Sequence, residues 1–313
     1  MKIKLGIFFL LFFVAAIAQN KSIDKNPFII ILGVSQDAGY PQIGCEKDCC
    51  KRAVNDPSQK RMVVSFALVD PETHNWWLFE ATPNIAEQLQ LFRKQTKSQY
   101  NILPKAIFLT HGHIGHYTGL MYLGREAMNT LSLDVYAMPR MKNFLLQNGP
   151  WSQLISLKNI SLQNISADSA INISANLSVT PFIVPHRDEF TETVGFTIRY
   201  HDFKLIFIPD IDKWKKFDRN INEMIKESSV ALLDGTFYKD GEVVGRSMNE
   251  IPHPFIEESI KQFSSLSEND KKKIYFIHFN HTNSLLNNSS SEFSSVIHLG
   301  FNTAQQAQRI DFK

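Results

Sequence analysis

The stretch Phe108–Leu120, FLTHGHIGHYTGL, contains three closely spaced histidines: His111, His113 and His116. The apolar run Ala106–Leu109 predicts a buried strand before them, and we expect a helix to begin at Tyr117. The imidazoles would then lie on the turn between the strand and the helix. Neutral imidazole is well suited to bind zinc or iron at neutral pH. The stretch therefore predicts a metal site, in preference to a solvated histidine-rich turn.

Three further apolar runs end in residues that can bind a metal. Val184-Pro185 leads to His186, Ile206–Pro209 to Asp210, and Tyr275–Ile277 to His278. Any one of these residues alone is more often structural, because a polar residue after a strand commonly caps a turn. Together with the histidine turn they indicate a site whose ligands stand at the ends of rigid strands.

The motif HGHIGH followed by Gly119-Leu120 resembles the HxHxDH signature of the metallo-β-lactamase-fold hydrolases. His186, Asp210 and His278 match the later ligands of that family in their order. The resemblance is strongest to the branch that includes the quinone-cofactor biosynthesis protein PqqB. Further matches to this branch occur at Gly119–Met121, Arg125-Glu126, Asp234–Phe237, Gly245-Arg246, Ile251–Pro254 and His278–Asn283.

The resemblance implies an α/β fold, the αββα four-layer sandwich of the metallo-β-lactamase type. No repeat, coiled coil or long linker interrupts residues 19–313, so we expect them to form a single domain. The resemblance places the metal site at one edge of two packed sheets. By this resemblance the first metal is held by His111, His113 and His186. Asp210 bridges the two metals, and His116 and His278 belong to the second.

One position departs from the signature. Gly115 stands where the family has an aspartate that binds the second metal. Loss of an anionic ligand predicts one tightly bound ion and a second that is weakly held or absent. Asp37 or Asp188 could compensate, although nothing in the sequence shows that either does.

The expected chemistry is hydrolysis of an ester, lactam or phosphodiester-type bond in a small molecule. A bound dication brings the pKa of water from 15.7 to about 7 and acts as a Lewis acid. We expect zinc, as one or two ions, with iron or manganese as alternatives. Asp210 and His253 are the catalytic candidates, His253 for proton transfer or substrate contact, although a structural role is equally consistent with its position.

Two other functions remain open. The first is a metal-dependent oxygenase or oxidase, because iron also takes histidine and carboxylate ligands. The other is a non-catalytic metal-binding protein that lost turnover together with the aspartate at position 115.

The cysteines form a separate cluster, Cys45, Cys49 and Cys50, whose odd number prevents complete pairing within one chain. With a histidine from elsewhere they could form a closed four-coordinate zinc site. Some relatives, notably the phosphodiesterase of phosphonate breakdown, carry such a site, and their histidine corresponds to His281. The relatives use the spacing C-x-C-x-x-C, whereas this chain has C-x-x-x-C-C. A local disulfide with one free thiol is the alternative.

The first residues read as a secretory signal. Lys2 and Lys4 precede the apolar run Leu5–Ala18, which ends in Ala16-Ile17-Ala18. We expect cleavage before Gln19 and a periplasmic or secreted protein without a stable membrane anchor, because the run is shorter than the about 20 residues of a membrane span. An uncleaved anchor is the alternative. Export argues against a role in a cytoplasmic pathway of quinone-cofactor synthesis.

The overall composition is that of an ordinary globular protein. Of the 313 residues, 43% are hydrophobic and 20% charged, and the net charge of +2 is too small and too evenly spread to indicate a nucleic-acid partner. Val63–Val69 and Trp76–Glu80 predict a hairpin. Leu120, Leu123 and Ala127 predict that the helix from Tyr117 continues to Ala127, and Lys213–Glu227 predicts one charged surface helix.

Overall fold

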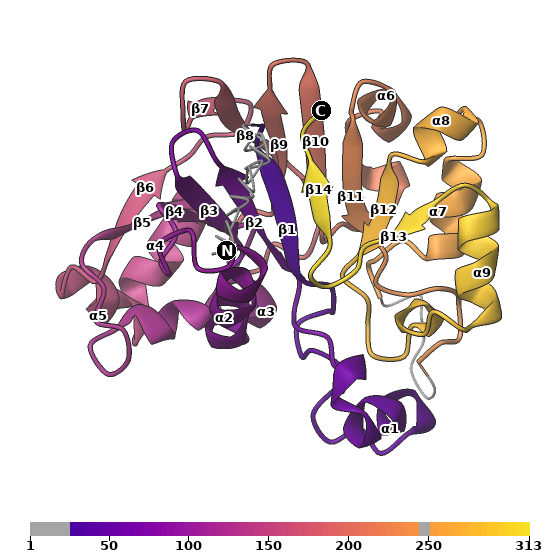
Figure 1. Ribbon diagram of the computed structural model, residues 1–313, viewed down its shortest axis with the longest axis horizontal. Coiled ribbons are helices and arrows are strands. Elements are labelled where there is room, and N and C mark those ends of the chain that lie inside the picture. Colours follow the sequence, from indigo (N-terminus) through magenta and orange to yellow (C-terminus); the bar gives the residue numbers. More distant parts are fainter. Residues whose placement is uncertain (1–25, 244–250) are drawn as a thin grey trace, which may run out of the picture.

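Two seven-stranded β-sheets form the centre of the fold, as the computed structural model of residues 26–243 and 251–313 shows (Figure 1). The order in the first sheet is β14-β1-β2-β3-β4-β5-β6, and in the second β13-β12-β11-β10-β9-β8-β7. The strands of the first sheet are β1 Phe28–Gly33, β2 Ser65–Asp70, β3 Asn75–Phe79, β4 Ala106–Phe108, β5 Leu133–Ala137, β6 Ile160–Asn164 and β14 Arg309–Asp311. Those of the second are β7 Ile171–Asn172, β8 Leu177–Ile183, β9 Val194–Tyr200, β10 Phe203–Ile208, β11 Val230–Asp234, β12 Ile274–Ile277 and β13 Asn302–Thr303.

Successive side chains of a strand point to opposite faces of the sheet, so each sheet contributes apolar residues to a core on both of its faces. In β1, Ile29 and Ile31 join the core between the sheets, whereas Ile30 and Leu32 join the core on the outer side. Aromatic rings from both sheets meet between them. The Phe66 ring stacks on Phe79 of the same sheet, with centroids 4.4 Å apart, and meets Phe207 of the other sheet edge-on at 4.9 Å. Such aromatic pairs contribute about 0.5–1.5 kcal/mol each beyond their buried area.

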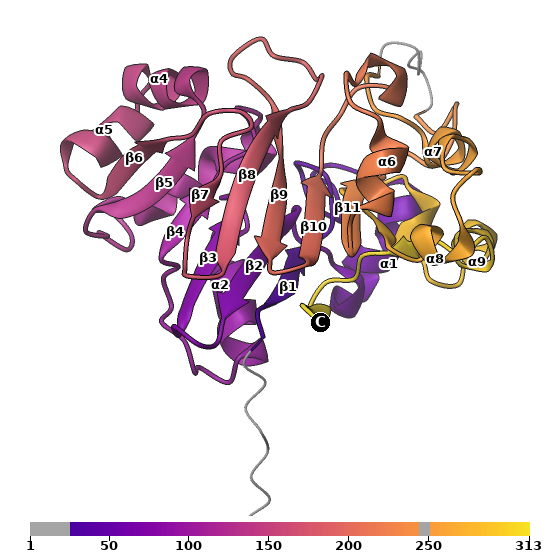
Figure 2. The same cartoon turned by 90° about the horizontal axis from the view of Figure 1, so that it is seen from above.

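Helices cover the outer face of each sheet (Figures 1 and 2). The outer core of the first sheet includes residues of α2 (Ile85–Gln95), α4 (Pro139–Gln147) and α5 (Trp151–Ser156). Residues of α6 (Ile221–Lys226), α7 (Ile256–Gln262) and α9 (Ser291–His298) pack against the second sheet. The other α-helices in the described part of the chain are α1 Asp48–Asn55, α3 Ile114–Tyr117 and α8 Glu268–Lys271. This is the predicted αββα four-layer arrangement.

Parallel strands bring the polar residues together. β3, β4 and β5 run parallel in the first sheet, and β10, β11 and β12 run parallel in the second. Parallel neighbours end at the same edge of a sheet. The residues that follow β3, β4, β10 and β12 are Glu80, the histidine turn, the segment with Asp210, and His278. The site therefore lies where the carboxyl ends of these strands meet.

The hairpin prediction is confirmed, since β2 and β3 pair antiparallel. The predicted helix from Tyr117 to Ala127 is wrong: α3 begins at Ile114, and a 3₁₀ segment, Thr118–Leu123 (η2), follows and ends before Gly124. The backbone of this segment packs tightly at Gly119. A Cβ on Gly119 would lie 2.0 Å from the carbonyl oxygen of Thr82, so only glycine permits this close approach.

The prediction of one helix over Lys213–Glu227 is also wrong. The segment forms a 3₁₀ turn, Trp214–Lys216 (η3), and the separate helix α6. Asn220 divides them because its side-chain oxygen accepts hydrogen bonds from the backbone N–H groups of Asn222 and Glu223. Asparagine is among the residues most favoured at this helix-capping position.

The predicted leader 1–18, the cleavage point at Gln19 and the Gly245-Arg246 motif lie outside the described residues. Within residues 26–243 and 251–313, none of the helices has the length and apolar character needed to cross a membrane.

Candidate metal centre

Asp210 lies at the centre of a cluster of buried imidazoles. Its Oδ2 atom is 3.5 Å from His111 Nε2, 2.9 Å from His116 Nε2 and 3.3 Å from His278 Nε2. Its Oδ1 atom is 3.7 Å from His186 Nε2. None of these five side chains is more than 3% exposed. Four of the five predicted histidine ligands thus present the same ring nitrogen to one carboxylate.

His113 is the fifth predicted histidine ligand, and it turns Nδ1, not Nε2, toward the other histidines. Its Nδ1 atom lies 2.8 Å from His111 Nε2, and its Nε2 atom lies 3.4 Å from Glu189 Oε1. His113 is 11% exposed and Glu189 44%, so solvent reaches the centre from this side. The residue sets whose ligand atoms all lie within 4.8 Å of one another include His111/His113/His186, Asp37/His116/His278, His111/His116/Asp210 and His186/Asp210/His253.

Four of the histidines turn Nε2 toward Asp210. Their other ring nitrogen, Nδ1, faces a further polar group. The Nδ1 distances are 2.9 Å from His111 to Thr110 Oγ1, 3.4 Å from His116 to Glu80 Oε2, 3.4 Å from His186 to Asp212 Oδ1 and 2.8 Å from His278 to Thr236 Oγ1. The contacts of His111 and His278 are hydrogen bonds, whereas those of His116 and His186 are N···O approaches to carboxylates. Groups in these positions can orient metal-binding histidines. Sequence reasoning missed these four residues as site residues. A signal existed for two of them, because Thr110 and Asp212 lie within two positions of predicted ligands.

Two residues at the centre have left-handed backbone conformations. Glu80 has φ of 72° and His278 has φ of 70°, and each directly follows a strand. A non-glycine residue in this region costs about 1–3 kcal/mol and persists only where its surroundings enforce it. Directing these two side chains at the centre therefore lowers the stability of the fold by this amount.

The charges of the centre are strongly coupled. Burial opposes ionisation of Asp210, but the imidazoles of His278 and His186 outweigh it and hold the pKa of this carboxyl well below its usual range. Burial and the neighbouring His116 lower the pKa of His111 well below the ordinary value. Burial also disfavours protonation of His116, yet Glu80 and Asp210 raise its pKa well above that value. The environment thus favours the ionised form of Asp210 and the protonated form of His116, whereas it favours the neutral form of His111.

The donor atoms fit a divalent metal ion. Several buried atoms have no hydrogen-bond partner within the described ranges: His116 Nε2, His186 Nε2, His278 Nε2, Asp210 Oδ1 and Asp37 Oδ1. Buried polar atoms are nearly always partnered, so a cluster of unpartnered ones requires an explanation. Imidazole nitrogen and carboxylate oxygen together are the ligand set of zinc, iron and manganese.

The structure also brings His253 to the centre. Its Nδ1 atom lies 2.8 Å from Asp234 Oδ2 and 3.3 Å from Asp210 Oδ1. Burial disfavours the charged ring, but the carboxylates of Asp234 and Asp210 outweigh it and raise the pKa of His253 to about 9. The protonated form of His253 is therefore favoured at neutral pH beside Asp210.

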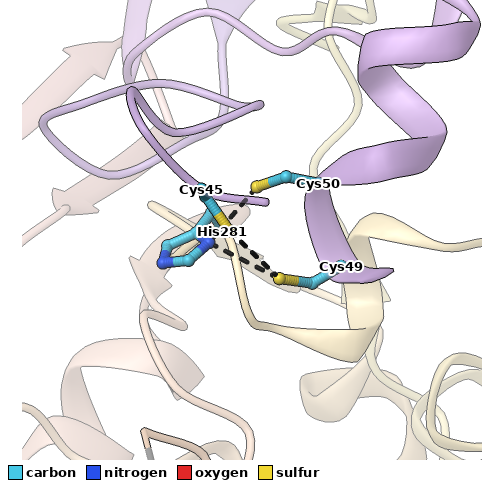
Figure 3. Close-up of side chains that lie close together, drawn as sticks. All are labelled: Cys45, Cys49, Cys50 and His281. Carbon is cyan, nitrogen blue, oxygen red and sulfur yellow. Dashed lines mark hydrogen bonds between the residues drawn. The ribbon is translucent and has the colours of Figure 1, made fainter. Parts of the chain in front are cut away.

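The three cysteines and His281 form a second cluster (Figure 3). Cys49 and Cys50 lie in the first turn of α1, Cys45 lies in the loop before it, and His281 follows β12. The His281 Nδ1 atom is 3.6 Å from Cys49 Sγ and 3.3 Å from Cys50 Sγ. The Sγ atoms of Cys45 and Cys49 are 3.7 Å apart, well beyond the about 2.05 Å of a disulfide bond. All four side chains point toward one another, as a tetrahedral site requires.

Residues 75–279 match the family model described as a β-lactamase superfamily domain. This range contains all the active-site residues predicted above. The chain belongs to the β-lactamase superfamily, and its fold is the predicted metallo-β-lactamase fold.

Within that superfamily the chain is similar to coenzyme PQQ synthesis protein B of Xanthomonas oryzae pv. oryzae, with 28% identity over 90% of this chain and 99% of the relative. Among solved structures it is similar to the Zn²⁺-bound PqqB of Methylobacterium extorquens, with a TM-score of 0.76, 24% identity, and 91% and 99% of the two chains covered. It also resembles a diphosphatase of the PhnP family, with a TM-score of 0.63, 20% identity, and 92% and 97% covered. The predicted similarity to PqqB is thus confirmed.

Proposed function

We propose that this chain is an exported, metal-dependent hydrolase that acts on an ester, lactam or phosphodiester-type bond of a small molecule. One observation supports it above all. Five buried side chains direct ring nitrogens and carboxylate oxygens, several without a hydrogen-bond partner in the described ranges, at one point. Such a set would cost free energy without a cation.

The residues divide into two groups that share a carboxylate. His111, His113 and His186 would hold one ion. His116 and His278 would hold a second, and Asp210 faces both groups. When bound, a divalent ion supplies activated water at neutral pH and Lewis-acid polarisation of the scissile bond.

His253 would supply the proton that the leaving group needs. Asp234 holds the ring through Nδ1 and keeps the imidazole protonated. Asp234 is itself fixed, since its Oδ1 atom accepts hydrogen bonds from the backbone N–H and the hydroxyl of Thr236. A general acid contributes about 10²–10⁴-fold in rate when it is positioned in this way.

The comparisons support hydrolysis without naming a substrate. One structural neighbour is called a diphosphatase, which favours hydrolysis at a phosphoryl group. The relatives named for PQQ synthesis instead favour a role close to that pathway, in which an oxygenase or oxidase reaction is the alternative. The predicted leader argues against a role in that pathway, because it would export the chain from the cytoplasm.

A structural zinc ion in the cysteine cluster is the second part of the proposal. The cluster joins α1 to the segment after β12, so an ion there would tie two distant parts of the chain together. Zinc bound in this closed form adds directly to folding free energy.

Elemental analysis of the purified protein, followed by a screen of ester, lactam and phosphodiester substrates, tests the proposal. Zinc with turnover that disappears in His111→Ala supports hydrolysis. His298→Ala is the matched control, because this histidine is exposed at the end of α9. Redox-active iron with oxygen consumption would favour the oxygenase, and a protein without active-site metal would overturn the proposal in favour of a non-catalytic role.

Export has its own test. N-terminal sequencing of protein from the native host should begin at Gln19. Recovery of intact Met1 from the cytoplasm would contradict export and leave the proposed chemistry untouched.

A further inference from the structure

Position 115 has no room for a side chain. A Cβ built on Gly115 would lie 2.2 Å from Asp37 Oδ1, 2.9 Å from Asp37 Cγ and 2.6 Å from Asp37 Cα. The last contact is with backbone, so rotation of the Asp37 side chain would not relieve it. The Asp37 carboxylate thus occupies the space in which an aspartate at position 115 would stand.

Asp37 reaches Gly115 from a segment near the N-terminus of the described chain. It lies in the loop after β1, and that loop is tied to the segment that carries His278. The Phe279 N–H donates to the Val34 carbonyl, and the Gln36 N–H donates to the Phe279 carbonyl, both at 2.8 Å. The backbone around Asp37 and the backbone around His278 are therefore one hydrogen-bonded unit.

The carboxylate is directed at the centre. Asp37 Oδ1 lies 3.2 Å from His116 Nε2, and Asp37, His116 and His278 have ligand atoms within 4.8 Å of one another. Although the side chain is 23% exposed, its Oδ1 atom is buried and has no hydrogen-bond partner in residues 26–243 and 251–313. A buried, unpartnered carboxylate oxygen costs free energy unless a cation satisfies it.

The other acidic candidate points elsewhere. Asp188 is 72% exposed, its Oδ2 atom is 3.6 Å from Arg140 Nη1, and its backbone carbonyl accepts a hydrogen bond from Arg140 Nη2. Of the two carboxylates that could compensate for Gly115, only Asp37 belongs to the cluster.

We propose that Asp37 takes over the role of the aspartate missing at position 115 and completes, with His116, His278 and Asp210, the second half of the metal centre. This inference rests on the proposed function, because it assumes that the centre binds metal. It replaces the sequence-based expectation of a weak second site: both ions should be held tightly. Position 115 must then be glycine, because any side chain there would displace Asp37 from the centre.

Metal stoichiometry after dialysis against a chelator tests this directly, with Asp37→Ala, Asp188→Ala and His111→Ala beside the wild type. Asp37→Ala should lose one ion relative to the wild type, and Asp37→Asn should hold that ion more weakly. Asp188→Ala should equal the wild type. Gly115→Ala should lose the same ion as Asp37→Ala and melt at a lower temperature, although Asp37 itself is intact.

The outcomes separate the two proposals. If His111→Ala loses metal but Asp37→Ala retains as much as the wild type with equal affinity, the role of Asp37 is wrong and the metal centre stands. If His111→Ala and the wild type hold equal amounts, no ion binds at the centre, and both proposals fail. A wild type whose centre holds a single ion would also overturn the role of Asp37.

Discussion

Glu80 Oε2 lies 3.4 Å from the Nδ1 atom of His116, and both side chains are fully buried. The carboxylate stands behind the ring, on the side away from Asp210. Burial raises the pKa of Glu80, and His116 opposes this effect. The pair thus has the geometry of a carboxylate that orients a metal-binding histidine.

Glu80→Gln should therefore weaken metal binding without removing a ligand. Loss of such a partner typically costs about 10–100-fold in metal affinity or activity. Competition with a chromophoric chelator measures the affinity, and circular dichroism checks the fold. Unchanged affinity with unchanged activity would show that Glu80 only fills space.

His253→Asn should separate proton transfer from metal binding. We expect kcat to fall by about 10²–10⁴-fold while metal content stays at the wild-type level. The wild-type rate should also decline as pH rises through about 9, because the proton is lost there. The variant should lack this alkaline limb. If His253→Asn instead loses metal, His253 is a ligand.

Much of the centre can be predicted from sequence because its ligands directly follow apolar strands. Asp210 and His278 follow the buried strands β10 and β12, whose parallel arrangement with β11 brings their ends together, and His186 follows β8 of the same sheet. The contacts that sequence does not show are of another kind. Glu80 reaches His116 through a positive φ, and no pattern around Glu80 indicates that conformation. Asp37 enters through packing against Gly115, a contact between distant segments.

The same distinction applies to the helices. Apolar spacing alone predicts a regular helix after the histidine turn, but that segment is a 3₁₀ helix in which Gly119 approaches the Thr82 carbonyl closely. The break at Asn220 does have a local signal, because asparagine is a strong helix cap. Cys45 and His281 meet through tertiary structure, and only the family resemblance indicated that pairing.

Acid should release zinc from the cysteine cluster. Burial raises the pKa of Cys50 to about 12 in the metal-free protein, so zinc must displace the thiol proton on binding. Proton competition grows as pH falls, and a chelator should therefore remove the ion more readily at about pH 5.5 than at about pH 8. Thiols titrated with Ellman's reagent after each treatment report on this cluster alone, because the chain has 3 cysteines. Equal thiol reactivity at both pH values would contradict zinc ligation.

His278 and His281 lie three residues apart, and we expect them to have opposite roles. His278 Nε2 faces Asp210, whereas His281 Nδ1 faces Cys49 and Cys50. An open catalytic site can lose a ligand while the fold survives, because the core does not depend on that ion. A closed structural site contributes folding free energy, since the unfolded chain has no preformed site.

His278→Ala should therefore abolish activity with a modest change in melting temperature. His281→Ala, like Cys45→Ser, should reduce bound zinc and destabilise the protein. A loss of about 3 kcal/mol would lower the melting temperature of a chain of this length by about 5 °C. Thermal melts and zinc content measure both effects, with the exposed His298→Ala as the control. If His281→Ala melts like the wild type and keeps all its zinc, the cluster binds no structural ion, and its cysteines must instead be a disulfide and a free thiol.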